Sequence, residues 1–468
     1  MTRLSRSLLF FLGVAGVCSA SPGALLTPAS PSPRSLETRS RSGFLSFPIQ
    51  QTQRDKPRVS RRQVDDISAP LFNVSYVGYL IELSIGTPGQ SVKVAIDTGS
   101  DELWVNPDCN DRELLATQRQ ECLANGRYNA ARSTTSSTDK VIGPPTETIQ
   151  YGIGSVEMEY TTDNIAFPGS DIELDSVQFA IATETDDLNE GILGLSFGNG
   201  TNLVYPNLVD ELFAQNITDS KAFSVGLGAL GSESSGVLIF GGIDTKKYTG
   251  DLIMNEIQGP QFARDIHRYY LNLDSIGIDR NGRTATYSGS SAVVVLDTGA
   301  SFSYFPDSVL RAMASDIGGR YSANAGLYLV PCSLLEQDGT FDFKFESGVV
   351  KIPIRDMIIQ DTQAQACALA ADKELAGSGI DMLLGDSFLR SVYVVFDQTT
   401  GTIGMAPYVD CGSNEQPLPA TGAKGMKGEC DPASSKQDKD NAAGGRLVAS
   451  YASVWAGVVV GLLGLALV

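Results

Sequence analysis

Two segments of the chain each place an aspartate directly after a run of apolar, mostly β-branched residues. They are residues 92–100 (VKVAIDTGS) and residues 292–301 (AVVVLDTGAS), so Asp97 and Asp297 lie at the ends of two expected strands. A carboxylate at such a place is costly in free energy unless it is paired, hydrogen-bonded or protonated. The repetition of Asp-Thr-Gly in matching contexts therefore predicts that each aspartate is the partner of the other.

Two carboxylates that face each other share one proton, because like charges within hydrogen-bond reach cannot both ionise. One carboxylate can then accept a proton from a water between them while the other donates its proton to a polarised carbonyl. This chemistry hydrolyses a peptide bond without a metal, another cofactor or a covalent intermediate, and we expect none of these here. The alternative is that Asp-Thr-Gly only forms a turn where each strand ends. The matching contexts of the two motifs favour the catalytic interpretation.

Beyond these two loops, the chain resembles the pepsin family of aspartic endopeptidases, and in particular its fungal, surface-anchored, yapsin-like branch. The resemblance covers most of residues 75–408. Its motifs are GTPG at 86–89, LWV at 103–105, YGIGS at 151–155, GILGL at 191–195, FGGID at 240–244 and LLGD at 383–386. The chain departs from the family at Ile153, where a small hydroxyl residue is commoner, and at Asp101-Glu102, which replace a commoner uncharged pair.

The resemblance implies an all-β, bilobal fold with an active-site cleft between two antiparallel β lobes, at residues 63–250 and 251–410. Asp97 and Asp297 would lie at the floor of the cleft, and the hairpin at 151–155 would fold over it as a flap. A simple surface hairpin is the alternative to a flap. The other expected site residues bind substrate or bring donors to the carboxylates: Thr98, Gly99, Ser100, Trp104, Tyr151, Gly152, Thr298 and Gly299.

Local patterns predict a few further elements. Short alternating strands separated by Gly, Pro and Asn occupy residues 77–105. Residues 206–217 have a helical pattern, with Leu208, Val209, Leu212 and Phe213 on its apolar side, and a short helix is expected at 307–317. Residues 109–122 are expected to form a polar surface loop.

The chain has seven cysteines, and six remain if Cys18 leaves with a signal peptide. An even number in a secreted chain favours disulfides over metal ligation, although the sequence alone leaves about fifteen pairings open. The resemblance and closeness along the chain favour Cys109 with Cys122 and Cys332 with Cys367. Cys411 and Cys430 are then left as the third pair. The single histidine likewise leaves few ligands for zinc.

The N-terminal part of the chain has the composition of processing segments. Residues 1–20 combine Arg3 and Arg6 with an apolar run and small residues, which is typical of a secretory signal peptide. Residues 21–62 are rich in Pro, Ser and Arg and end at Arg61-Arg62, which suggests a propeptide cut by a kexin-type enzyme. The first 62 residues carry a net charge of +8, which leaves −27 for the rest. We expect the two parts to attract, with a solvated linker as the alternative.

The C-terminal part suggests attachment to a membrane. Residues 411–441 are expected to form a polar stalk, and residues 442–468 to be a GPI-attachment signal that is removed on maturation, with Asn441 as the attachment residue and Gly444 as the second choice. An ordinary transmembrane anchor is the alternative. Three N-glycosylation sequons indicate a secreted surface: Asn73, Asn199 and Asn216. We therefore expect a monomer at the cell surface, GPI-anchored to the plasma membrane or held in the cell wall.

The expected substrates are polypeptides, and the strongly acidic chain argues against nucleic acid as a partner. The yapsin-like resemblance implies cleavage after Lys or Arg, and the acidic pairs Asp101-Glu102 and Asp186-Asp187, with Glu190, give partial support. Such charges are often only solvated, and a pepsin-like preference for aliphatic and aromatic residues is the alternative. The rival function is an inactive, protease-like surface binding or wall-structural protein. Loss of a catalytic aspartate or of Tyr151 would mark such a protein, and all three residues are present.

Overall fold

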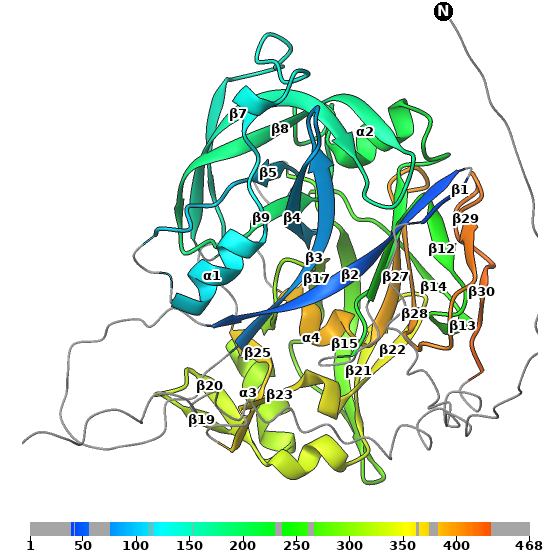
Figure 1. The fold of residues 1–468 in the computed structure, drawn as a ribbon. Helices are drawn as coiled ribbons and strands as arrows, with labels where there is room; N and C mark the ends of the chain where they lie inside the picture. The colour runs from blue at the N-terminus through cyan, green and yellow to red at the C-terminus, as the bar shows by residue number, and fades with distance from the viewer. Residues whose placement is uncertain are drawn as a thin grey trace, which may run out of the picture. The chain divides into compact units, whose positions relative to one another are not determined.

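The computed structural model describes residues 39–41, 43–55, 75–111, 114, 116–152, 154–229, 236–260, 266–361, 365–373 and 382–431. The expected signal peptide, the Arg61-Arg62 pair, Asn73, Ile153, Asn441 and the C-terminal attachment signal lie outside these residues. The described part of the chain is mostly β, with strands from both halves in one large sheet (Figure 1). This confirms the predicted fold class.

The largest sheet has 14 strands and joins the two halves of the chain. In order across the sheet they are β14 (Ile253–Glu256), β28 (Thr402–Pro407), β27 (Val392–Asp397), β10 (Ala222–Gly226), β11 (Gly236–Phe240), β2 (Phe44–Asp55), β3 (Ser75–Ile85), β4 (Gln90–Asp97), β9 (Gly191–Gly194), β5 (Leu103–Val105), β8 (Glu173–Asp186), β7 (Ser155–Ala166) and β6 (Thr146–Gln150), with β1 (Arg39–Arg41) paired to β2.

The second half of the chain builds two sheets of its own. The eight-stranded sheet contains β22 (Gly348–Pro353), β21 (Thr340–Phe345), β15 (Tyr270–Arg280), β17 (Ala292–Leu296), β26 (Met382–Leu384), β18 (Ser303–Phe305) and β25 (Ala371–Lys373), with β16 (Arg283–Thr286) on β15. The four-stranded sheet contains β19 (Arg320–Ser322), β20 (Leu327–Val330), β24 (Ala366–Leu369) and β23 (Ile358–Asp361).

Short helices connect these strands. They are α1 (Ala116–Ala124), α2 (Leu208–Ala214), α3 (Asp307–Asp316) and α4 (Asp386–Leu389), with 3₁₀ turns η1 (Ala130–Arg132), η2 (Cys332–Glu336) and η3 (Ile354–Met357). The prediction of a polar loop at 109–122 was wrong, because α1 occupies much of it and buries Gln118 and Cys122. In α2, Phe213 is 42% exposed, whereas Asp210 is buried because it completes a capping box with Asn207.

The same three-strand arrangement carries each aspartate loop. Strand β4 runs parallel to β9, and β9 runs antiparallel to β5, so Asp97 lies opposite Gly194. In the second half, β17 runs parallel to β26 and β26 antiparallel to β18. The backbone contacts also repeat: Ser196 N–H donates to the Ser100 carbonyl at 2.9 Å, and Asp386 N–H donates to the Ala300 carbonyl at 2.8 Å. The duplication seen in the sequence is therefore a duplication of local structure.

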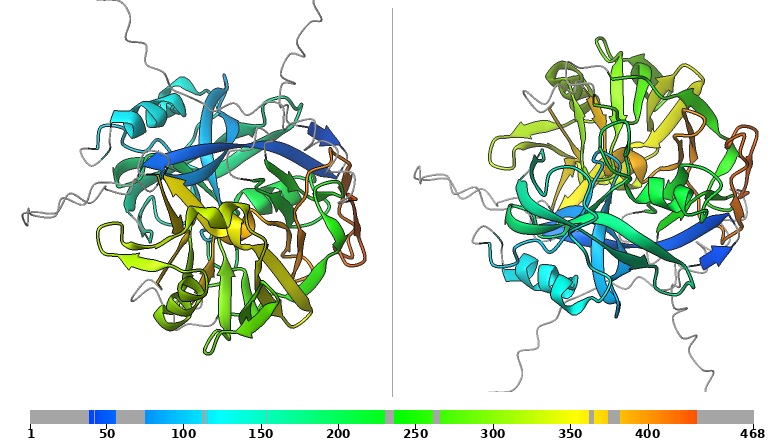
Figure 2. Two further views of the ribbon diagram at one scale, coloured as in Figure 1. Left: turned by 90° about the horizontal axis from the view of Figure 1, so that it is seen from below. Right: turned by 90° about the horizontal axis from the view of Figure 1, so that it is seen from above.

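Strand β2 lies within the expected propeptide and forms part of the large sheet (Figure 2). Its first half pairs with β11 and its second half with β3. Phe44, Leu45, Phe47 and Ile49 are each at most 1% exposed. This part of residues 21–62 is therefore not a solvated linker, because it supplies side chains to the core.

Residues 411–431 are folded onto other strands and do not form the polar stalk that we expected there. Strand β29 (Glu415–Pro417) pairs with β12 (Gly242–Asp244), and β30 (Lys427–Glu429) pairs with β13 (Thr249–Asp251). The Cys411–Cys430 disulfide closes this segment, and Leu418 and Ala423 are buried. The segment packs on the β body through these contacts, so residues 411–431 are not an extended spacer.

The structure joins the two cysteine pairs that the resemblance favoured, Cys109–Cys122 and Cys332–Cys367, and the two remaining cysteines form Cys411–Cys430. Within the described residues, no helix is long and apolar enough to cross a membrane.

Candidate active site

The threonines of the two loops bind each loop to the strand that carries the other. Thr98 N–H donates to Thr298 Oγ1 at 3.1 Å, and the Thr298 hydroxyl donates to the Ile96 carbonyl at 3.0 Å. The reciprocal pair is Thr298 N–H to Thr98 Oγ1 at 3.0 Å and the Thr98 hydroxyl to the Leu296 carbonyl at 2.9 Å. We expected these hydroxyl groups to donate to the carboxylates, but they donate to backbone carbonyls instead. They hold the two loops together, because each of these four donors has its acceptor on the other loop or on the strand that leads into it.

The glycines supply the backbone donors and leave room for the opposite aspartate. Gly99 N–H donates to Asp97 Oδ1 and Gly299 N–H to Asp297 Oδ1, each at 2.8 Å. A Cβ atom on Gly99 would lie 2.6 Å from the Asp297 carboxylate, and one on Gly299 would lie 2.5 Å from Asp97 Oδ1. Any side chain at either position would displace a carboxylate, so the Asp-Thr-Gly motif needs its glycine here.

The two carboxylates have unequal surroundings. Asp97 is 6% exposed, and its Oδ2 accepts a 2.5 Å hydrogen bond from the Ser100 hydroxyl. Ala300 occupies the matching position in the second loop and has no hydroxyl. Burial, and next the negative charge of Asp97, hold the pKa of Asp297 well above the ordinary value of a carboxyl group. A group with this pKa keeps its proton at pH values where an ordinary carboxyl group is ionised.

The hairpin of β6 and β7 approaches the first loop through an aromatic pair. Trp104 Nε1 donates to the Tyr151 hydroxyl oxygen at 2.8 Å, which places these residues together as expected. Tyr151 N–H closes the turn on the Gly154 carbonyl at 3.0 Å, and Gly152 lies exposed at the turn. Burial, followed by the charge of Asp97, raises the pKa of Tyr151, so its hydroxyl stays protonated. The hydroxyl can therefore donate a hydrogen bond to a bound substrate while it accepts one from Trp104.

Asp101 and Glu102 do not form the acidic substrate surface suggested by the sequence. The Asp101 carboxylate pairs with Arg268, whose Nη1 lies 2.8 Å from Oδ2 and 2.9 Å from Oδ1. Glu102 is 8% exposed and accepts a 2.6 Å hydrogen bond from the Tyr160 hydroxyl. Burial raises the pKa of Glu102 to about 7. The sequence signal for these roles was the unusual pair of charges directly after a buried loop.

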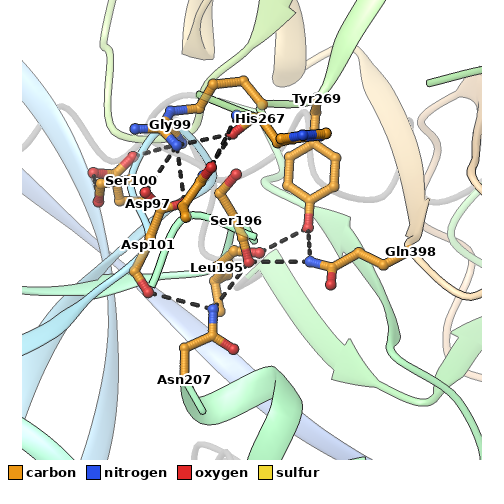
Figure 3. Close-up of polar contacts among 12 residues, drawn as sticks. Asp97, Gly99, Ser100, Asp101, Leu195, Ser196, Asn207, His267, Tyr269 and Gln398 are labelled. Atoms are coloured by element: carbon orange, nitrogen blue, oxygen red, sulfur yellow. Dashed lines mark hydrogen bonds and ion pairs between the residues drawn. The ribbon is translucent and has the colours of Figure 1, made fainter. Parts of the chain in front are cut away.

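The segment after β9, at Leu195 and Ser196, makes further contacts that no local sequence pattern indicated, two of them with the second half of the chain (Figure 3). Tyr269 donates its hydroxyl proton to the Leu195 carbonyl at 2.7 Å. Gln398 Nε2 donates to the Ser196 carbonyl at 3.0 Å, and Asn207 Nδ2 donates to the same carbonyl at 2.9 Å. These amides contact backbone atoms, so their sequence neighbourhoods carry no recognisable motif.

Other expected site residues are placed as follows. Asn199 and Asn216 are exposed, as a glycan acceptor must be, whereas Asn73 lies outside the described residues. Among the described residues, no cluster of three His, Cys, Asp or Glu side chains has the geometry to hold a metal ion.

Residues 78–408 of the chain match the family described as eukaryotic aspartyl protease. The chain belongs to this family. Among its relatives, the probable aspartic-type endopeptidase OPSB of Trichophyton verrucosum is 30% identical over 425 residues, which cover 82% of each chain. Secreted aspartic protease 8 of Candida albicans is 30% identical over 333 residues, or 70% of this chain and 75% of the relative.

The fold of this aspartyl protease is also found among solved structures. The crystal structure of aspartic proteinase from Irpex lacteus has a TM-score of 0.56 at 20% identity, and the match covers 72% of this chain and 96% of the other. The family and its relatives identify the chain as an aspartic endopeptidase acting on polypeptides.

Proposed function

We propose that Asp97 and Asp297 are the catalytic pair of this endopeptidase and that they activate one water for attack on the peptide carbonyl. The observation that carries the proposal is the reciprocal placement of the loops, in which each glycine leaves room for the opposite carboxylate. The threonine contacts hold this geometry before substrate binds. Such preorganisation lowers the barrier because the acid and the base need no rearrangement during the reaction.

The unequal surroundings suggest a division of labour within the pair. The Ser100 hydroxyl favours the ionised form of Asp97, which accepts a proton as the water oxygen bonds to the carbonyl carbon. Asp297 holds the shared proton and donates it to the carbonyl oxygen, which gives a neutral tetrahedral intermediate. The proton on Asp97 then passes to the amide nitrogen as the C–N bond breaks, and Asp297 recovers its proton from the intermediate. These reaction steps need no metal ion.

The test is to replace either aspartate by asparagine, which keeps the shape of the side chain and removes its acid–base chemistry. Asp97→Asn and Asp297→Asn should each lower kcat by at least about 10³-fold on a denatured protein substrate at acid pH, while the variants fold and are secreted. Asp338→Asn is the matched control, because Asp338 is exposed on the second half of the chain. Substantial activity in either folded active-site variant would overturn the assignment.

We also propose a preference for Lys or Arg before the scissile bond. The support is the acidic mature chain, the yapsin-like resemblance and the position of Asp186. Asp186 is exposed and pairs across β7 and β8 with Ser155, at the tip of the hairpin that carries Tyr151. Asp101 is engaged by Arg268, so it gives this preference no support.

Profiling of a mixed peptide library tests the preference. Asp186→Asn should lower cleavage after Lys and Arg about two- to fivefold relative to cleavage after Leu and Phe, because one favourable Coulomb interaction is lost. Asp338→Asn should leave the ratio unchanged. If the unmodified enzyme cuts mainly after Leu and Phe, the pepsin-like alternative holds.

Finally, we propose that the protein is a secreted zymogen, GPI-anchored at the cell surface, monomeric and N-glycosylated. The support is the pattern of residues 1–62 and 442–468, the exposed sequons at Asn199 and Asn216, and the secreted relative from Candida albicans. Mass spectrometry of the mature protein would identify its termini, its glycans and any lipid. A mature protein that retains residues 442–468 would rule out the GPI signal.

A further inference from the structure

The ion pair between Asp101 and Arg268 joins the first aspartate loop to the second half of the chain. Asp101 is four residues beyond Asp97, and Arg268 lies two residues before the start of β15. The side chains are 11% and 17% exposed, so the pair is shielded from solvent screening. Arg268 Nη1 also donates to the His267 carbonyl at 2.9 Å, which fixes the guanidinium against its own backbone.

Asn202 ties the same two segments together a second time. Its Nδ2 donates to Asp101 Oδ1 and to the His267 carbonyl, both at 2.8 Å, and its Oδ1 accepts from His267 N–H at 2.9 Å. Asn207 adds a 3.3 Å hydrogen bond to the Asp101 carbonyl (Figure 3). Asp101 is thus held at its carboxylate and at its backbone, by residues from two separate segments, 202–207 and 267–268.

We propose that Arg268 and Asn202 are positioning residues that hold the first aspartate loop in its working geometry through Asp101, and that this contact supports the turnover of the peptidase. The proposal rests on the catalytic roles proposed for Asp97 and Asp297. The threonine contacts hold Ile96 and Thr98, on either side of Asp97, and the Asp101 cluster holds the chain three residues beyond Thr98. A small displacement of a catalytic carboxylate is enough to lower turnover strongly.

The charges of the cluster give the proposal a specific electrostatic signature. The Asp101 carboxylate and the Arg268 cation act on the catalytic pair with opposite signs, and Arg268 lowers the pKa of Asp297. The other titratable groups that contact or interact with the cluster are Asp97, Asp297, Glu102, His267, Tyr269 and Tyr270. Loss of Arg268 alone leaves the Asp101 carboxylate without its counter-charge. This negative charge disfavours ionisation of Asp97 and Asp297, so both limbs of the pH–activity profile move to higher pH. Loss of the Asp101 charge alone moves the profile to lower pH, most strongly on the high-pH limb, because burial raises the pKa of Asp101 and the carboxylate is fully charged only there.

The experiment measures kcat, KM and the pH–activity profile of the full-length processed enzyme on a defined peptide. Arg268→Gln and Asp101→Asn should each lower kcat about tenfold or more with KM changed less than about twofold, because geometry rather than binding is lost. Their pH profiles should move in opposite directions by about half a unit. The double variant should recover the wild-type midpoint while its kcat stays low. Asn202→Ala should lower kcat with little change in the midpoint.

Two further variants separate positioning from general damage. Arg283→Gln removes a comparable but exposed ion pair with Asp316 and should change nothing. Arg268→Lys keeps the charge and should restore the pH midpoint and part of kcat. If Arg268→Gln does not fold, Arg268→Lys and Asp101→Asn still test the proposal through kcat.

Two outcomes overturn the inference. One is kcat within about twofold of wild type in Arg268→Gln or Asp101→Asn, since displacement of a catalytic group costs far more than that. The other is a shift of both pH profiles in the same direction, which would indicate only a structural loss. Activity that persists in Asp97→Asn would instead refute the catalytic assignment, so the two failures are distinguishable.

Discussion

At the scale of single residues, the two loops share a motif but differ in one hydroxyl group. Asp97 accepts from Ser100, and the equivalent position beside Asp297 is Ala300. A hydroxyl donor stabilises the charged form of the carboxylate that it contacts, so the two members of the coupled pair are not equivalent. The position of the shared proton therefore depends on a residue outside the Asp-Thr-Gly motif.

Ala300→Ser should make the two loops more alike. The added hydroxyl group can donate to the ionised form of Asp297, so the high-pH limb of the activity profile should move down by about half to one pH unit. The profile of kcat/KM against pH measures this shift. A high-pH limb that stays in place in a folded Ala300→Ser enzyme would show that residue 300 does not reach the carboxylate.

The catalytic aspartates could be proposed from the sequence because their chemistry lies within three adjacent residues, repeated once. The actual role of Thr98 could not, because its hydrogen-bond partner Thr298 is 200 positions away. The same holds for Arg268, which lies in a polar stretch that has no motif. Long-range hydrogen bonds depend on the topology of the fold, and a local pattern does not record them.

At the scale of elements, the hairpin of β6 and β7 is joined to the first loop at two places. Trp104 contacts Tyr151 near the tip, and Glu102 contacts Tyr160 further along β7. Glu102 is also close enough to feel the charges of Asp101 and Glu147, which raise its pKa beyond the effect of burial. The contact between Glu102 and the hairpin therefore depends on the protonation state of Glu102, and so on pH.

Glu102→Gln should make the stability of the protein less dependent on pH. The folded state holds the Glu102 proton up to about pH 7, against an ordinary value of 4.5. The stabilisation is therefore complete below about pH 4.5 and is lost as pH rises through 7, by a total on the order of 3 kcal/mol. Glutamine still accepts from Tyr160 and carries no charge. Urea unfolding at pH 4.5 and 7.5 measures the difference, and an equal loss of stability in both proteins would contradict this account.

Several elements were predictable from local pattern, and others were not. The helix at 307–317 was found, because its apolar residues recur at helical spacing and contact the core. Helix α1 was missed, because its burial depends on Cys122 and the disulfide to Cys109 rather than on an apolar stripe. Strand β2 was missed because Pro48 and its polar second half obscure a short buried run.

At the scale of the whole chain, the large sheet contains strands from the expected propeptide and from both expected lobes. It takes β1 and β2 from the expected propeptide, β3 to β11 from the first lobe, and β14, β27 and β28 from the second. Strand β27 pairs with β10 over five residue pairs, so the end of the catalytic region is built into the first half. Cleavage at the proposed site, Arg61-Arg62, would therefore separate from the rest of the chain a strand that lies inside the fold.

The last prediction concerns the state of the protein after cleavage at Arg61-Arg62. The four buried apolar side chains of β2 together contribute about 6 kcal/mol or more, and the strand also has backbone partners on both sides. The cleaved segment should therefore stay bound at neutral pH without a covalent link. Treatment with a kexin-type enzyme followed by size-exclusion chromatography and mass spectrometry should find it in the protein peak.

Variants of β2 show whether packing holds the segment. Phe47→Ala should weaken its retention by about 3 kcal/mol or more, because a large buried ring is lost, and should release the segment at lower denaturant concentration. Gln50→Ala, at an exposed position on the same strand, should behave like the unmodified protein. Complete separation of the unmodified segment at neutral pH, with the rest of the chain still folded, would show that these contacts do not hold it, since four buried side chains cannot be exposed to water without a measurable cost.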